Sequence, residues 1–308
     1  MKGFPIVFLH NKKSNFLLPA IYQARRSNPT SPIYIISSID AKSFYQPHAN
    51  FINIDDFFNE ARDFEKIYKH LNSNSYAFEL ICIQRWYVLN EFMKKMQFDK
   101  IVVLDSDCLL YLDVSIDWNR LKGYDFGLIN ILCPAVTYIC SQSSIQKFCN
   151  YVNEEYTVNL ENTVNSYKER FIDTGNIGGI CDMTHFSTFH TKFNTIYDLS
   201  RIENNTTYDI SIRDSINTSA IDITPEEAAG YKMNPKNGFK SIYWEKGIPY
   251  CKLNATNRAI QFKSLHFQGI AKVEMPYYYQ GELSLKLKFI KNNLSERFAA
   301  FRKDIFKK

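Results

Sequence analysis

The sequence has no hydrophobic run that approaches the roughly 20 apolar residues of a membrane-spanning helix. The first residues, MKGFPIVFLHNKK, contain an apolar stretch that charge interrupts too soon for a secretory signal peptide. There is no internal repeat, no low-complexity tract and no linker rich in proline, glycine and serine. We therefore expect a cytoplasmic protein that folds as one continuous unit.

The seven cysteines include no C-x-x-C pair and no cluster with histidine at the spacing of a zinc site. Their number is odd and they are widely spread, so we expect reduced, mostly buried thiols. This pattern argues against a disulfide scaffold and against a structural zinc site.

The net charge of +5 is too small to indicate a nucleic-acid partner, and none is predicted. The positive charge is concentrated at 286–308, where eight lysines and arginines stand against two acidic residues. The apolar residues of this segment recur near helical spacing. The simpler interpretation is a helix that docks on the body of the protein, and the alternative is a basic amphipathic helix that contacts an anionic membrane at its inner face.

Short apolar runs and helical patterns alternate through the first third of the chain. We expect strands at 5–9, 33–37, 51–54 and 101–105, and helices near 15–26, 57–71 and 76–96. Fully apolar strands separated by helices are typical of a mostly parallel sheet with helices on both faces. The first third therefore predicts a Rossmann-type, doubly wound α/β core.

After residue 114 the strands become shorter and more mixed in character. We expect strands at 124–130, 135–141 and 259–267, two more around the turn within 239–253, and helices at 143–156 and 182–190. These patterns predict a smaller antiparallel sheet beside the parallel one.

Two aspartates, Asp105 and Asp107, follow the apolar strand IVVL. In open α/β sheets ligands bind at the carboxyl ends of strands. On a turn that leaves a strand, two carboxylates can converge on Mg²⁺ or Mn²⁺, which keep positions open for phosphate oxygens. Acidic residues are also common caps at strand ends, but the wholly apolar strand favours a cation that binds a diphosphate.

Two blocks of the sequence carry a resemblance to a known family. RWYVLNEFMKKMQFDKIVVLDSDCLLYLDV (85–114) resembles the helix, strand and D-x-D motif of GT-A fold glycosyltransferases. SLHFQGIAK (264–272) resembles the H-x-x-G-x-x-K segment of the retaining family that includes glycogenin and bacterial lipopolysaccharide galactosyltransferases, family 8. Two positions depart from that pattern: Val273 stands where the family usually has proline, and the first strand leads into HNKKSN rather than an acidic nucleotide-contact motif.

The resemblance implies a role for each matched residue. His266 would complete a Mn²⁺ or Mg²⁺ site with Asp105 and Asp107, Lys272 would contact the diphosphate of the donor, and Gly269 would allow the backbone to approach it. It also implies a catalytic domain over 1–275, divided into a nucleotide-binding half (1–114) and an acceptor half (115–275), with a basic helical extension over 276–308.

Five further residues are candidates for the donor or acceptor site. His10 and Asn11 follow the first strand, where they would bind the base and ribose unless the loop is simply solvated. Arg85 precedes the D-x-D strand and would contact donor hydroxyls or phosphate, or form a surface ion pair. Asp173 and Asp182 flank a pair of glycines and would contact the sugar or act as a base, although Asp182 is equally suited to cap a helix.

These features together predict a metal-dependent glycosyltransferase of polysaccharide biosynthesis. It would move a hexose from a nucleotide diphosphate sugar, with UDP as the expected nucleotide, to a glycan or lipid-linked glycan. The H-x-x-G-x-x-K segment favours retention of configuration, whereas a base at Asp173 or Asp182 would favour inversion. Two alternatives stay open: a sugar-phosphate nucleotidyltransferase, which normally has a glycine-rich loop that LHNKKSN lacks, and a catalytically silent glycan-binding protein of the same fold.

Overall fold

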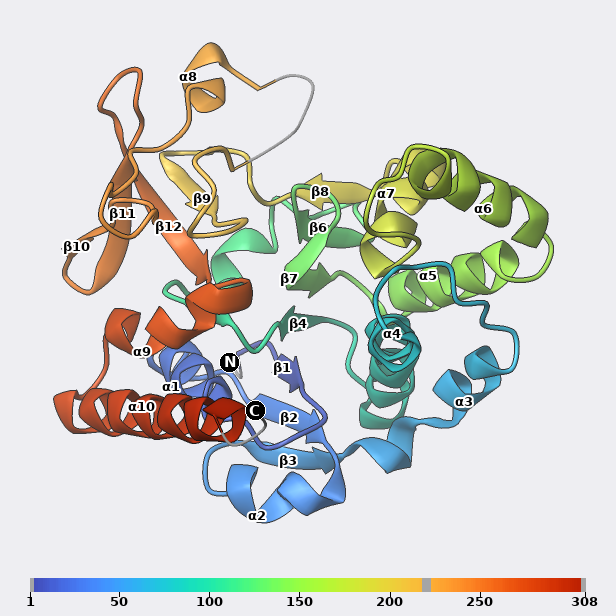
Figure 1. Cartoon of the computed structure of the whole chain (residues 1–308), viewed down its shortest axis with the longest axis horizontal. Helices are drawn as coiled ribbons and strands as arrows, with labels where there is room; N and C mark the ends of the chain where they lie inside the picture. The colour runs from blue at the N-terminus through green and yellow to red at the C-terminus, as the bar shows by residue number, and fades with distance from the viewer. Residues whose placement is uncertain (1–2, 218–222, 306–308) are drawn as a thin grey trace.

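A seven-stranded sheet forms the centre of the computed structural model, which describes residues 3–217 and 223–305 and the side chains up to residue 295 (Figure 1). Its strands lie in the order β3 (Asn50–Asn53), β2 (Ile33–Ser37), β1 (Ile6–Leu9), β4 (Ile101–Leu104), β7 (Cys133–Ile139), β6 (Phe126–Ile129) and β8 (Ile196–Asp198). Only β7 runs antiparallel to its neighbours. The predicted mostly parallel sheet is confirmed.

A second, smaller sheet lies beside the first on the left of Figure 1. It contains β10 (Tyr243–Glu245), β11 (Ile248–Lys252), β12 (Ala259–His266) and β5 (Cys108–Leu110) in antiparallel order, with β9 (Thr206–Tyr208) paired parallel to β12. Strand β5 is the link between the sheets, because only a short turn separates it from the end of β4. The antiparallel sheet was predicted, but β5 and β9 were not.

Helices cover both faces of the large sheet (Figure 1). In chain order, the helices of the described residues are α1 (Leu17–Ser27), α2 (Lys42–Tyr45), α3 (Asn59–Glu65), α4 (Tyr76–Met96), α5 (Gln142–Glu155), α6 (Leu160–Tyr167), α7 (Asp182–Phe193), α8 (Pro225–Ala228), α9 (Met275–Tyr278) and α10 (Leu283–Ile305). Of these, α8 lies away from the large sheet, beside the small one (Figure 1). Helix α3 ends at Glu65 rather than near the predicted residue 71. The chain beyond it pairs instead with a distant loop, where Ile180 N–H donates to Leu71 O at 2.7 Å.

The strands of the large sheet separate two apolar cores because successive side chains point to opposite faces. On β4, Val102 and Leu104 pack in the core that contains α1 and the small sheet. Ile101 and Val103 pack in the core that contains α3, α4, α5 and α7. The all-apolar strand read from the sequence is thus buried on both sides, and its carboxyl end is held between two packed layers.

The expected docking of the C-terminal helix and the expected free cysteines are both found. Helix α10 docks on α1 and the chain after α9 through Phe289, whose ring lies 5.6 Å from Tyr22 and 5.3 Å from Tyr279. All seven cysteines are free thiols. Among the described residues, none of the helices is both long enough and apolar enough to cross a membrane. The division into 1–275 and 276–308 stays a prediction.

Candidate active site

The candidate site lies where the two sheets meet. β1 and β4 are parallel neighbours, so their carboxyl ends bring His10 and Asp105 to the same edge of the large sheet. The chain then makes a tight turn, closed by the Cys108 N–H donating to Asp105 O at 3.2 Å, and enters β5. Since β5 pairs with the end of β12, His266 lies opposite Cys108. The topology thus places His266 next to Asp107, as predicted.

Asp107 and His266 face each other inside the protein. Asp107 Oδ1 lies 3.6 Å from His266 Nε2, and both residues are buried. The other ring nitrogen, Nδ1, lies 2.6 Å from the carbonyl oxygen of Ile210, an acceptor, so Nδ1 carries a proton. Burial by itself lowers the pKa of His266, but the neighbouring Asp107 and Cys133 raise it well above 6.5. Nε2 is therefore the nitrogen turned toward Asp107.

Lys272 is the second cationic partner of Asp107. It follows Gly269 on a short 3₁₀ turn, Gly269–Glu274, and its Nζ lies 3.0 Å from Asp107 Oδ2 with 40% of the side chain exposed. Burial raises the pKa of Asp107, but His266 and Lys272 lower it to about 2. Asp107 is thus ionised at neutral pH, and its charge is balanced from two sides.

Arg85 joins Asp105 to Asp182. From the middle of α4, it donates to Asp105 Oδ1 at 2.8 Å and to Asp182 Oδ2 at 2.6 Å, and the Trp86 indole N–H lies 3.3 Å from the same Asp182 oxygen. A planar guanidinium can hold two carboxylates in this way because its donors form a rigid fork. Burial raises the pKa of Asp105, and Arg85 opposes that rise. Arg85 is therefore part of the site rather than of a surface ion pair.

Of the other predicted residues, His10 interacts with Asp107 and Lys272, whereas Asn11 and Asp173 are exposed. Burial and the charge of Lys272 lower the pKa of His10, while Asp107 raises it, so His10 is within electrostatic reach of both. Asn11 is exposed at the start of the following loop. Gly269 has φ +63°, a backbone conformation that residues other than glycine rarely adopt, and there is open space beside its Cα. Asp173 is exposed near the end of a π-helical turn, Lys168–Ile172, and its role stays a prediction.

Asp107 and His266 are placed to supply two ligands to a divalent cation, but not a complete set. Among the described residues there is no group of three His, Cys, Asp or Glu side chains already placed to hold a metal ion. Asp107 Oδ1 and His266 Nε2 are nevertheless separated by 3.6 Å, and neighbouring ligands of an octahedral ion with bonds of ~2.1 Å are about 3 Å apart. The Nδ1–H bond to a carbonyl is also the arrangement typical of a metal-binding histidine. Oxygens of a bound diphosphate would complete such a site.

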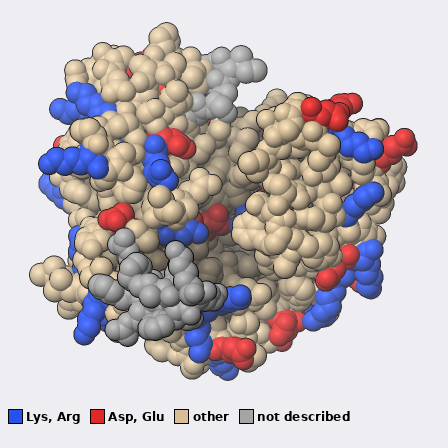
Figure 2. All heavy atoms as spheres, viewed as in Figure 1, with Lys and Arg blue, Asp and Glu red and all other residues tan. Residues whose placement is uncertain are grey.

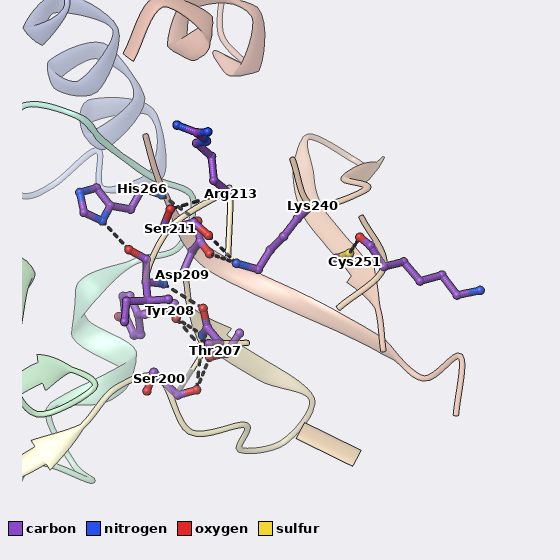
Figure 3. A network of polar contacts seen from close by, with 12 residues as sticks. Ser200, Thr207, Tyr208, Asp209, Ser211, Arg213, Lys240, Cys251 and His266 are labelled. Carbon is purple, nitrogen blue, oxygen red and sulfur yellow. Dashed lines mark hydrogen bonds and ion pairs between the residues drawn. The ribbon is translucent and has the colours of Figure 1, made fainter. Parts of the chain in front are cut away.

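Two residues next to His266 were missed in the sequence. Asp209 Oδ2 accepts the backbone N–H of His266 at 3.0 Å, and Lys240 Nζ lies 2.7 Å from Asp209 Oδ1 (Figure 3). Neither belongs to a motif, and both would be read as solvent-exposed charges. No signal in the sequence indicated that they pair in the interior.

Figure 2 shows that the face seen in Figure 1 is hollowed between the half with the small sheet and the half with α4 to α7. Acidic and basic side chains lie next to each other in this hollow. A groove with both signs of charge can receive a ligand that carries phosphates and hydroxyls together.

Similarity to known proteins is found among solved structures. No family model and no curated protein matches the chain. Among solved structures, an active-site mutant of LgtC aligns with a TM-score of 0.50 at 12% identity, over 95% of this chain and 96% of LgtC. The chain has the fold of the glycosyltransferase LgtC. The GT-A-like fold predicted from the sequence is confirmed.

Two further structures are similar to smaller degrees. Galactosyltransferase LgtC in complex with donor and acceptor sugar analogs aligns with a TM-score of 0.46 at 11% identity, over 94% of this chain and 96% of LgtC. The glycosyltransferase GlyE of Streptococcus pneumoniae TIGR4 aligns with a TM-score of 0.39 at 13% identity, over 69% of this chain. The chain spans about half of GlyE, 48% of its length.

Proposed function

We propose that this protein is a glycosyltransferase that moves a hexose from a nucleotide diphosphate sugar, with UDP as the nucleotide, to a hydroxyl of a glycan or lipid-linked glycan. The observation that carries the proposal is the meeting of Asp107, His266 and Lys272 at the junction of the two sheets. Two ligands suited to a divalent cation and a partly exposed ammonium together make a site for a diphosphate. The fold shared with LgtC supports the same conclusion.

Asp105, Asp107 and His266 would hold the cation, Mn²⁺ or Mg²⁺. When bound, it would supply positive charge to the leaving nucleoside diphosphate. Lys272 lies on the exposed side of Asp107, where its ammonium can reach an oxygen of the same diphosphate. His10, at the end of β1, would contact the nucleotide from the opposite side of this edge.

Arg85 and Asp182 would orient the sugar of the donor. Asp182 already accepts hydrogen bonds from Arg85 and Trp86, and only a small part of it is exposed. A carboxylate bound in this way is a poor general base but a good anchor for a sugar hydroxyl. This supports retention of configuration over inversion, which NMR of the anomeric centre of the product would test.

The test is a donor screen that measures nucleoside diphosphate release from a panel of nucleotide sugars with Mn²⁺ and with EDTA. We expect release with one donor in Mn²⁺ and loss of release in EDTA, in Asp107→Asn and in His266→Ala. Asp63→Asn is the matched control, because Asp63 is an exposed aspartate on α3 whose ion pair is with Lys66. Unchanged release in EDTA would remove the cation from the proposal.

Two further assays, of pyrophosphate release and of glycan binding, separate the two alternatives. A nucleotidyltransferase would release pyrophosphate from a nucleoside triphosphate and a sugar phosphate. A silent glycan-binding protein would bind a glycan without turning over any donor. Either result with folded wild-type protein would contradict the proposed transferase activity and support the corresponding alternative.

We also propose a peripheral membrane contact through α10. While Phe289 packs inward, Leu283, Leu287 and Leu294 share one helical stripe and are 69%, 58% and 40% exposed. Lys286 and Lys291 flank this stripe, so an anionic lipid surface would match both its apolar and its charged parts. Co-sedimentation with vesicles of phosphatidylglycerol should exceed that with phosphatidylcholine and should fall when the three leucines are replaced by serine. Equal recovery of wild type and variant would contradict the contact.

A further inference from the structure

Asp209, which follows β9, and Lys240, which precedes β10, form an ion pair that is completely buried. Lys240 Nζ lies 2.7 Å from Asp209 Oδ1, and neither side chain is exposed to solvent (Figure 3). Taking two charges out of water is so unfavourable that such a pair is often replaceable by apolar side chains without loss of stability. Stability alone therefore does not account for the pair.

The segment that carries Asp209 contacts His266 at three points. Asp209 Oδ2 accepts the His266 backbone N–H at 3.0 Å, and Ile210 O lies 2.6 Å from the ring Nδ1. Ile212 N–H donates to the carbonyl of His266 at 2.9 Å. The backbone and the ring of His266 are thus held by one short stretch, residues 209–212.

Lys240 holds this stretch in place from behind. Its Nζ donates to Ser211 O at 2.5 Å as well as to Asp209, and its backbone N–H donates to Ile212 O at 2.7 Å. Figure 3 shows Lys240 reaching the stretch from the side opposite His266. The Lys240 ammonium therefore joins the Asp209 carboxylate to the Ser211 carbonyl, and its loss would leave both without this partner.

The geometry of β12 explains why His266 needs this support. β5 pairs with one edge of β12, but β9 pairs with the other edge only as far as Tyr208, with an irregularity between Phe262 and Ser264. Beyond Tyr208 the Asp209 carboxylate, rather than a strand carbonyl, accepts the His266 N–H. This substitution leaves the carbonyl of Ile210 available for the imidazole.

We propose that Asp209 and Lys240 are positioning residues that fix the His266 imidazole with Nδ1–H on Ile210 and Nε2 toward Asp107, and thereby set the affinity of the site for a divalent cation. The cation part rests on the proposed function, whereas the orientation of the ring does not. Loss of a residue that orients a metal ligand typically weakens metal binding about 10- to 100-fold.

The experiment compares two double variants of the full chain. Asp209→Leu with Lys240→Met replaces the pair by apolar side chains and removes the acceptor of the His266 N–H. Asp209→Asn with Lys240→Met is also uncharged but keeps an amide oxygen in the place of that acceptor. Because neither leaves a lone buried charge, both are expected to fold, which urea unfolding checks.

Two measurements are made on each protein. Titration with Mn²⁺, alone and with UDP, is expected to give a dissociation constant about 10- to 100-fold higher for the leucine–methionine variant, with most of the loss restored in the asparagine–methionine variant. NMR of ¹⁵N-histidine protein, without metal, is expected to show a hydrogen-bonded Nδ1–H of His266 in wild type that disappears in the leucine–methionine variant.

Asp125→Asn with Lys147→Met is the control. Lys147 lies on α5, and its ion pair with Asp125, at 2.7 Å, includes neither His266 nor the stretch 209–212. Mn²⁺ affinity within about threefold of wild type in the leucine–methionine variant, or an equal loss in the control, would overturn the proposal. A wild type that binds no Mn²⁺ with or without UDP would contradict the proposed cation, and the Nδ1–H signal would still decide whether the pair orients the ring.

Discussion

Replacing Lys272 by methionine (Lys272→Met) should change two affinities of the site in opposite directions. The substitution removes an ammonium 3.0 Å from Asp107 Oδ2 and keeps most of the side-chain volume. In the free protein Lys272 and a divalent cation compete for the same carboxylate. In the complex with a nucleoside diphosphate the ammonium has phosphate oxygens to bind, so its loss is then unfavourable.

The structure sets the size of both effects. Lys272 is 40% exposed, and solvent therefore reduces its attraction to Asp107 to about 1 kcal/mol, which corresponds to about fivefold tighter Mn²⁺ binding in the variant without nucleotide. A charge-assisted hydrogen bond to phosphate contributes about 1.5–3 kcal/mol, so UDP should bind about 10- to 100-fold more weakly to the variant in saturating Mn²⁺.

Calorimetric titration measures both constants on the same protein. Lys272→Arg, which keeps the charge, should leave both within a few-fold of wild type. Lys246→Met, which removes an exposed lysine from the turn between β10 and β11, is the control for a general change in charge. Weaker Mn²⁺ binding in Lys272→Met would refute the competition between Lys272 and the cation, and unchanged UDP binding would refute the contact of Lys272 with the diphosphate.

Three further predictions concern residues around the site and in the core. Asp117→Ala leaves the buried Lys263 without the carboxylate that now lies 2.6 Å from it, so we expect a loss of about 3–5 kcal/mol in the free energy of unfolding in urea. Burial lowers the pKa of His185 to about 4, so the unfolded chain takes up the proton first as the pH falls below 6.5. The stability difference between wild type and His185→Gln should therefore shift against wild type by about 3 kcal/mol between pH 7 and pH 4, and a constant difference would contradict the neutral buried imidazole. Lysine cannot hold both carboxylates, so Arg85→Lys is expected to lose the charge-assisted bond to Asp182, and the donor KM should rise about 10-fold while UDP affinity changes little. An unchanged KM would place Arg85 outside the sugar site.

The strongest features of the fold were predictable from local pattern. The strand at 33–37 and the helix at 76–96 have the predicted bounds, because a fully apolar run and a long helical period identify themselves without tertiary information. The end of β4 at the D-x-D motif follows from the same logic. Strand β5 was missed because CLL continues an apolar region with no turn signal of its own, and only its pairing with β12 makes it a strand.

The candidate site was predictable only in part. The meeting of Asp107 with His266 was expected from the resemblance of two short blocks to a family, and no local pattern would have paired them. The pairing of Asp209 with Lys240 was missed because charged residues are usually exposed, and their burial depends on how β9, β12 and the connecting chain pack. The partner of Arg85 was likewise set by α7, which approaches α4 only in the folded protein.

The proposed function depends on one divalent cation that both His266 Nε2 and Asp107 bind. Electron spin echo envelope modulation of Mn²⁺ bound to ¹⁵N-histidine protein in the presence of UDP tests it most directly. We expect a directly coordinated ¹⁵N that is lost in His266→Ala and retained in His185→Gln. Bound Mn²⁺ without any histidine nitrogen in the wild-type protein would contradict it.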